Sequence, residues 1–163
     1  MKTVIFWFRN DLRLEDNPAL LRAVREADEV VPVYIFDDRT WSEERASIRR
    51  RKFQAESLAD LRSELERRGG ALLIQSGAPR EVLRALADEH GAKAVFATKE
   101  HTTEEVEREE EVASDLVLHL EEALTLVHPD DLPFALEQLP DVFTRFRNKV
   151  EKDWVICETV GAP

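Results

Sequence analysis

The residues that most constrain this fold are Val4 to Phe8, an unbroken apolar run that stops at a charged turn. Valine, isoleucine and aromatic side chains in such a run are typical of a strand buried on both faces, as in a parallel sheet. Asn17 and Pro18 follow as a helix cap and a first helical position, where the missing N–H of proline costs nothing. This order of strand, charged turn and helix predicts an α/β fold with a ligand site at the carboxyl end of the sheet.

The rest of the chain repeats this alternation of strand and helix. Strand-like apolar segments follow at 30–36, 71–75, 93–97 and 115–120. Helical patterns lie between them at about 44–68, 79–90 and 102–113. Together these segments predict a doubly wound, Rossmann-like fold with a five-stranded, mostly parallel sheet and helices on both faces.

The composition limits the classes of function. The formal net charge is −11, from 23 Lys and Arg against 34 Asp and Glu, and such a surface repels nucleic acid. We interpret the basic cluster of Arg45 and residues 49–52 as the solvated start of a helix, so we expect no direct nucleic-acid binding. The lone Cys157 has no partner for an internal disulfide, and neither a signal peptide nor a membrane span is visible. The expected location is the cytoplasm, with no membrane partner.

No motif for catalysis or metal binding stands out. The sequence contains no glycine-rich phosphate loop, no metal-spaced set of Cys and His, and no nucleophile triad. We therefore assign no catalytic residue and no metal ligand, and we leave open whether the chain is an enzyme.

Five segments carry a resemblance to a known family. They are R-N-D-L-R-L-E-D-N-P-A-L from Arg9, R-R-K-F-Q-A-E-S-L-A-D-L-R from Arg50, A-T-K-E-H-T-T-E-E-V from Ala97, T-L-V-H-P-D-D-L-P-F from Thr125 and L-P-D-V-F-T-R-F-R-N-K-V-E from Leu139. In this order and spacing they resemble the photolyase and cryptochrome family of blue-light flavoproteins, and most closely its DASH branch.

The resemblance implies the N-terminal α/β domain of a two-domain protein. Residues 1–128 would form this domain, and 129–163 an extended tail with a short helix at the start of the interdomain linker. The helical domain, which in the family holds FAD and the DNA-binding groove, would be absent from this chain. The implied function is an antenna module for methenyltetrahydrofolate, or for a flavin or deazaflavin, without the light-driven DNA repair that is the family's activity.

The resemblance also implies where an antenna chromophore would lie. Glu100 falls where DASH proteins place a carboxylate against the folate, with Lys99 and His101 beside it. A carboxylate can accept hydrogen bonds from pterin N–H groups or balance a cationic methenyl group. The alternative interpretation is that Glu100 is a solvated loop acid after the fourth strand.

A second, deeper site is possible at the carboxyl ends of the first two strands. We expect parallel strands to bring the turns that follow them to one edge. A nearby arginine could meet a phosphate there. The alternative for Asp11, Arg13 and Asp16 is a structural role in shaping the turn. The candidates at this deeper site are Arg9, Asn10, Asp11, Phe36, Asp37, Asp38 and Arg50.

The tail offers a function of a different class. Phe134, Phe143 and Phe146 lie in a segment whose apolar residues need a surface to pack against. A partner-binding or dimerising module is therefore the alternative to an antenna. Its partner would be a separate FAD-binding helical domain or a second copy of the chain.

Overall fold

The computed structural model describes residues 1–42, 46–153 and 158–163. The predicted helix start near Glu44, the basic residue Arg45 and the lone Cys157 lie outside the described residues.

The sheet has five strands in the described part of the chain: β1 (Thr3–Phe8), β2 (Glu29–Phe36), β3 (Leu73–Ser76), β4 (Val95–Thr98) and β5 (Leu118–Glu121). Their order is β3-β2-β1-β4-β5, and every pairing is parallel. The predicted sheet is confirmed. The chain winds from β1 outward to β3 and then crosses back to β4, so the switch point of the topology lies between β1 and β4.

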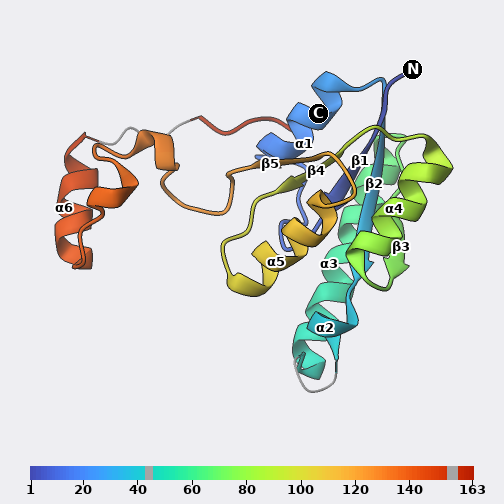
Figure 1. Ribbon diagram of the computed structural model, residues 1–163, viewed down its shortest axis with the longest axis horizontal. Coiled ribbons are helices and arrows are strands. Elements are labelled where there is room, and N and C mark those ends of the chain that lie inside the picture. The colour runs from blue at the N-terminus through green and yellow to red at the C-terminus, as the bar shows by residue number, and fades with distance from the viewer. Residues whose placement is uncertain (43–45, 154–157) are drawn as a thin grey trace.

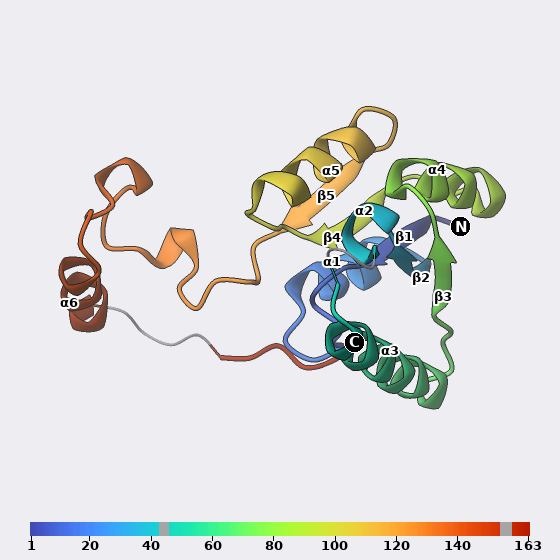
Figure 2. The ribbon, with the colours of Figure 1, turned by 90° about the horizontal axis from the view of Figure 1, so that it is seen from below.

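Helices cover both faces of this sheet (Figure 1, Figure 2). Residues of α1 (Pro18–Glu26) and α3 (Ile48–Arg67) pack on one face, and residues of α4 (Pro79–His90) and α5 (Thr103–Ala113) on the other. A single short turn of helix, α2 (Asp38–Trp41), follows β2.

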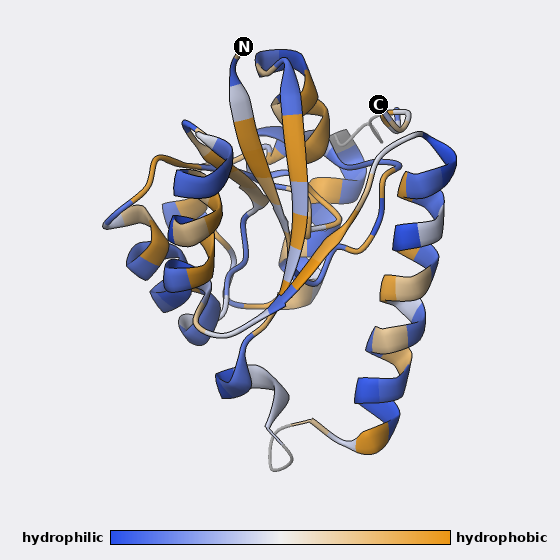
Figure 3. Ribbon diagram, turned by 90° about the vertical axis from the view of Figure 1, so that its right-hand side faces the viewer, coloured by the Kyte–Doolittle hydropathy of each residue, from blue (hydrophilic) through white to orange (hydrophobic). Residues whose placement is uncertain are grey.

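The central strand β1 explains why its sequence shows no alternation. Val4, Phe6 and Phe8 contribute to the core under α1 and α3, whereas Ile5 and Trp7 contribute to the core under α4 and α5. Both sets are buried, so every position favours an apolar residue. The hydropathy colouring shows the apolar strands between helices whose outer faces are hydrophilic (Figure 3).

The predicted helix signals at Asn17 and Pro18 are confirmed. The side chain of Asn17 caps α1 by accepting a hydrogen bond from the Leu20 amide at 3.0 Å, and Pro18 is the first helical residue. Helix α4 ends at Gly91, which has a φ of +63°, a conformation that favours glycine.

After β5 the chain leaves the body of the domain. It forms two short 3₁₀ turns, η1 (Pro129–Asp131) and η2 (Leu136–Gln138), and then α6 (Phe143–Asp153). We call residues 124–153 the arm, and it stands away from the sheet and its helices in both ribbon views (Figure 1, Figure 2). Residues 158–163 lie back at the body, where Ala162 packs against the core under α1 and α3. Among the described residues no helix has the length and apolar character to cross a membrane.

Candidate functional site

Two buried polar side chains meet at the switch point between β1 and β4. Arg9 follows β1 and Glu100 lies just beyond β4, and each side chain is about 95% buried (5% and 6% exposed). Nη2 of Arg9 lies 2.6 Å from Oε2 of Glu100. The amide Nδ2 of Asn10 donates to the other oxygen, Oε1, at 2.6 Å. Both oxygens of Glu100 are thus held by the turn after β1.

Residues of helix α5 hold this pair in place through further hydrogen bonds. Arg9 donates through Nη1 to Oε1 of Glu109, and through Nη2 to the backbone carbonyl of Glu105 at 3.3 Å. The same Glu109 oxygen accepts the backbone N–H of Glu100 at 2.9 Å. The Arg9 guanidinium lies 4.6 Å from the centroid of the Trp7 ring. This network fixes the position of the Glu100 carboxylate from two elements.

A second buried ion pair lies beside the first. Nε of Arg108, on α5, donates to Oδ2 of Asp37 at 3.0 Å, and both side chains are 8% exposed. Asp37 also caps α2, because its Oδ1 accepts the Arg39 amide at 3.0 Å. The pair therefore links the carboxyl end of β2 to α5.

A small cavity lies between the two ion pairs. Its volume is about 50 Å³, which admits a few water molecules. Trp7 and Tyr34 form part of its apolar wall. One oxygen of Glu105, Oε2, is buried at this cavity and meets no hydrogen-bond donor within the described residues. The ionisable residues that line the cavity are Arg9, Asp37, Glu100, Glu105 and Arg108.

Burial changes the acidity of the site. It raises the pKa of Glu100 above the value of 4.5 for an ordinary glutamate, and the Arg9 charge and the Asn10 hydrogen bond only partly offset this. Burial also raises the pKa of Tyr34 to about 12, so its phenol is neutral and can donate. The Glu100 carboxylate therefore takes up a proton more readily than a surface glutamate.

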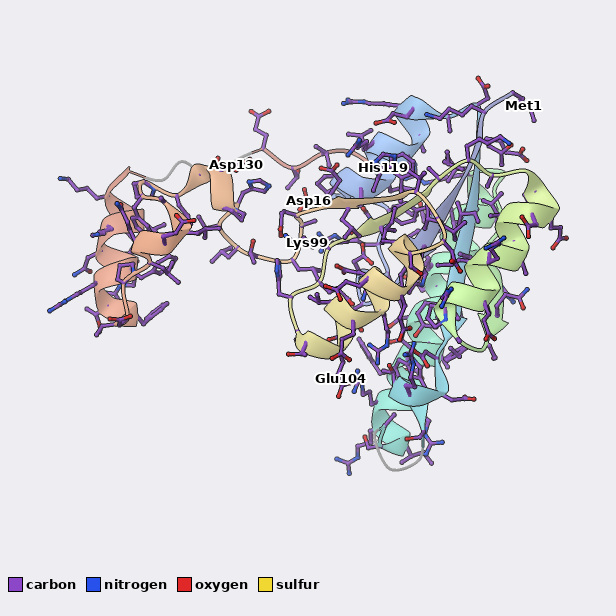
Figure 4. All side chains as sticks on the ribbon, in the orientation of Figure 1. Met1, Asp16, Lys99, Glu104, His119 and Asp130 are labelled. Atoms are coloured by element: carbon purple, nitrogen blue, oxygen red, sulfur yellow. The ribbon has the colours of Figure 1, made fainter. Side chains whose placement is uncertain are left out.

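A partly exposed cluster, which we call the shelf, adjoins Glu100 at the end of β5 and consists of Lys99, His101 and Glu122. Glu122 accepts from Nζ of Lys99 at 2.7 Å through one oxygen and lies 3.0 Å from Nε2 of His101 through the other. The ion pair with Glu122 raises the pKa of Lys99. In Figure 4, Lys99 lies on the side of the body from which the chain leaves for the arm. The two residues predicted beside Glu100 thus share one carboxylate.

Comparison with known proteins identifies the family. The model of the DNA photolyase family matches residues 4–162. This chain belongs to the DNA photolyase family. Cryptochrome DASH of Natronomonas pharaonis is 40% identical over 173 residues, covering 100% of this chain and 36% of that protein. A cryptochrome DASH of Arabidopsis thaliana is 43% identical, covering 98% of this chain and 30% of its own length.

Solved structures agree with this assignment. A Synechocystis cryptochrome has a TM-score of 0.92 at 33% identity, covering 100% of this chain and 36% of that one. A Sulfolobus tokodaii photolyase, solved with two FAD molecules and described as implying a novel light-harvesting cofactor, has a TM-score of 0.85 at 28% identity. That match covers 98% of this chain and 36% of the photolyase. The chain spans about a third of the length of these relatives.

Several of the predicted residues lie close together in this domain of the photolyase family. For Glu100, the alternative interpretation is wrong. Glu100 is not a solvated loop acid, because it is buried against Arg9 and Asn10. Asp37 also lines the cavity. Lys99 and His101 lie on the adjoining shelf instead.

Other predicted residues do not line the cavity. Asp11 accepts hydrogen bonds from the Thr98 hydroxyl and from the Arg9 backbone amide, so it shapes the turn, as the structural alternative predicts. Phe36 packs edge-on against Trp41. Asp38 is exposed, and Arg50 places its guanidinium 5.1 Å from the centroid of the Trp41 ring.

The residues missed from the sequence lie mainly on α5. Glu105, Arg108 and Glu109 recur at helical spacing, so a single face of α5 carries three ionisable groups toward the sheet edge. An isolated arginine flanked by glutamates in an otherwise acidic helix was the available signal. Glu122 had no signal beyond its position after the fifth strand.

Proposed function

We propose that this domain holds a light-absorbing antenna chromophore of the folate type against the Glu100 edge of the sheet. The observation that carries the proposal is the fixed, buried carboxylate of Glu100 at the switch point, the edge at which α/β folds bind ligands. By the resemblance, Glu100 also falls where DASH proteins place a carboxylate side chain against the folate. Membership of the DNA photolyase family supports a role in light capture.

The donors and acceptors at this edge fit a pterin ring. Each carboxylate oxygen offers two lone pairs, and Asn10 and Arg9 each use one on the Glu100 carboxylate. One acceptor site therefore remains on each oxygen for the N–H groups of a pterin. Lys99 and His101 lie beside it, and in the proposal they would exchange Glu122 for the carboxylates of a folate tail. Methenyltetrahydrofolate, when bound, would supply the absorption of near-ultraviolet and blue light.

The deeper cavity is small for a flavin or deazaflavin. Sites for molecules of that size usually enclose about 300 Å³ or more, whereas the cavity encloses about 50 Å³. Its lining also carries three carboxylates against two guanidinium groups, which disfavours a flavin phosphate. We therefore expect Arg9 and Asp37 to act at this edge through their ion pairs, and not by contact with a flavin.

The same proposal includes a partner for the arm. Residues 1–128 would act as the antenna body, and 129–163 would connect it to a helical domain that holds FAD, in the cytoplasm. An apolar groove of about 580 Å³ in the arm, lined by Leu126, Leu139 and Phe143 among others, supports a packing role. A homodimer through this groove is the alternative arrangement. Light-driven chemistry on DNA would belong to the helical domain.

The test is a binding titration of the purified chain with methenyltetrahydrofolate, followed by the shift of its absorption band. We expect saturable binding, and we expect Glu100→Gln to weaken it about tenfold because a charge-assisted hydrogen bond is replaced by a neutral one. Glu110→Gln on the exposed side of α5 is the matched control and should bind normally.

Parallel titrations with FMN and FAD separate the alternatives. Saturable binding of a flavin that depends on Arg9 would show that the cavity opens and would overturn the choice of chromophore. Folate binding that is equal in Glu100→Gln and Glu110→Gln would remove Glu100 from the site. A thermal melt of each variant shows whether the fold is retained.

A further inference from the structure

The turn after β1 contacts the chain on both sides of the arm. Nη2 of Arg13 donates to the backbone carbonyl of Ala123, the residue just before the arm, at 3.2 Å. Nε of the same guanidinium donates to the carbonyl of Asp16 at 3.0 Å. One side chain thus ties the exit of the arm to the end of the turn.

Asp16 holds the chain where it has returned from the arm. Its backbone N–H donates to the carbonyl of Val160 at 2.8 Å, and its Oδ1 accepts the Val160 amide at 3.3 Å. Asp16 has a φ of +51°, a left-handed conformation that aspartate tolerates better than most residues. This backbone lets a single residue present a donor and an acceptor to the same partner.

The returning segment has further attachments to the body. Nη1 of Arg68, at the end of α3, donates to the Pro163 carbonyl at 3.3 Å, and Ala162 packs against the core. In contrast, the arm itself stands away from the layers of the sheet (Figure 1, Figure 2). Figure 4 shows Asp16 beside the base of the arm. The body is therefore contacted by the residue just before the arm and by residues 158–163.

We propose that Arg13 and Asp16 form a clasp that closes the arm into a loop and fixes its position relative to the Glu100 edge. The same turn begins with Arg9 and Asn10, which hold Glu100, so a short segment of chain positions both the candidate site and the arm. The clasp goes beyond the proposed antenna function. It requires no chromophore and can be tested without one.

The test is hydrogen exchange of backbone amides by NMR, with ¹⁵N order parameters for residues 123–126. In Arg13→Ala we expect the Asp16 and Val160 amides to exchange about tenfold faster, as for the loss of one net hydrogen bond. We also expect the order parameters at 123–126 to fall. Arg25→Ala, at an exposed arginine of α1, is the matched control and should change neither reading.

Two variants of Asp16 isolate the return of the chain. Asp16→Gly removes the Oδ1 acceptor but adopts the positive φ without strain, so we expect faster exchange of the Val160 amide without loss of the fold. Asp16→Asn keeps an acceptor and should restore slow exchange. The amide of Phe6 in β1 reports global unfolding in every variant.

Each outcome bears on the clasp. If Arg13→Ala leaves the Val160 amide as slow as in the Arg25 control, the two ends are independent and the clasp is refuted. If Arg13→Ala unfolds the domain, as seen at Phe6, Asp16→Gly decides instead. Unchanged Val160 exchange in Asp16→Gly would then overturn the proposal, and faster exchange that Asp16→Asn reverses would support it.

Discussion

Replacement of Arg9 by methionine tests how far the buried charges at the sheet edge depend on one guanidinium. Methionine keeps the apolar contact with Trp7 but leaves Glu100 and Glu109 without their shared cation. These two side chains are only 6% and 7% exposed, so bulk water solvates them poorly once the partner is lost. Breaking a buried ion pair costs about 3–5 kcal/mol. We expect Arg9→Met to lose a large part of the total stability of the domain.

The assay is urea unfolding at pH 7 and at pH 5. Because the pKa of Glu100 is raised, the folded state takes up a proton above the pH at which the unfolded chain does. The free energy of unfolding gained from that proton increases as the pH falls. The gain is larger in Arg9→Met, because the Arg9 charge that lowers the pKa of Glu100 is missing. We therefore expect the deficit of Arg9→Met against the wild type to shrink at pH 5.

Two further variants make the result decisive. Arg9→Met with Glu109→Gln removes one uncompensated charge and should be more stable than Arg9→Met alone. Arg25→Met, at an exposed position, should stay within about 0.5 kcal/mol of the wild type. A loss below about 1 kcal/mol in Arg9→Met, with no change in the deficit between the two pH values, would refute the claim that Arg9 neutralises buried carboxylates.

Two other predictions concern pH and backbone conformation. The raised pKa of Glu100 predicts that folate affinity falls on acidification at a pH above 4.5, whereas Glu100→Gln should show no such fall in absorption titrations. A wild-type affinity that stays flat down to pH 4.5 would contradict it. Gly91→Ala should cost about 1 kcal/mol in urea unfolding because alanine is strained at φ +63°. Gly161→Ala, where a Cβ meets nothing within 4 Å, is its control, and equal stabilities would argue against strain at the α4 terminus.

The fold could be predicted because its signals are local. The run from Val4 to Phe8 is apolar at every position since both faces of β1 are covered. Asn17 and Pro18 mark the start of α1 by side-chain chemistry that needs no distant partner. Strand ends were less well predicted: the fourth strand begins at Val95 rather than residue 93, and the fifth at Leu118 rather than residue 115.

The candidate site could be predicted only in part because its contacts are distant in sequence. The turn after β1 and the residues after β4 belong to one edge by topology, yet the sequence predicted Arg9 and Glu100 for two separate sites. That Arg9 pairs with Glu109 depends on the rotation of α5 about its axis, and no pattern in an acidic helix fixes this rotation. The hydrogen bonds between Asp16 and Val160 could not be predicted either, because the two residues are 144 positions apart in the sequence.

The density of charge at this edge is itself an argument for function. Buried ion pairs can often be replaced as a whole by apolar residues without loss of stability, although the loss of one partner alone is costly. Stability alone therefore does not account for Arg9, Glu100 and Glu109 at an edge where Trp7 and Phe8 already fill the interior. What the charges provide is a carboxylate in a fixed position with lone pairs to spare. A polar ring laid against Glu100 would use those lone pairs, which a purely structural ion pair leaves unused. The network therefore supports the proposed role of Glu100 as a carboxylate that faces a bound ring.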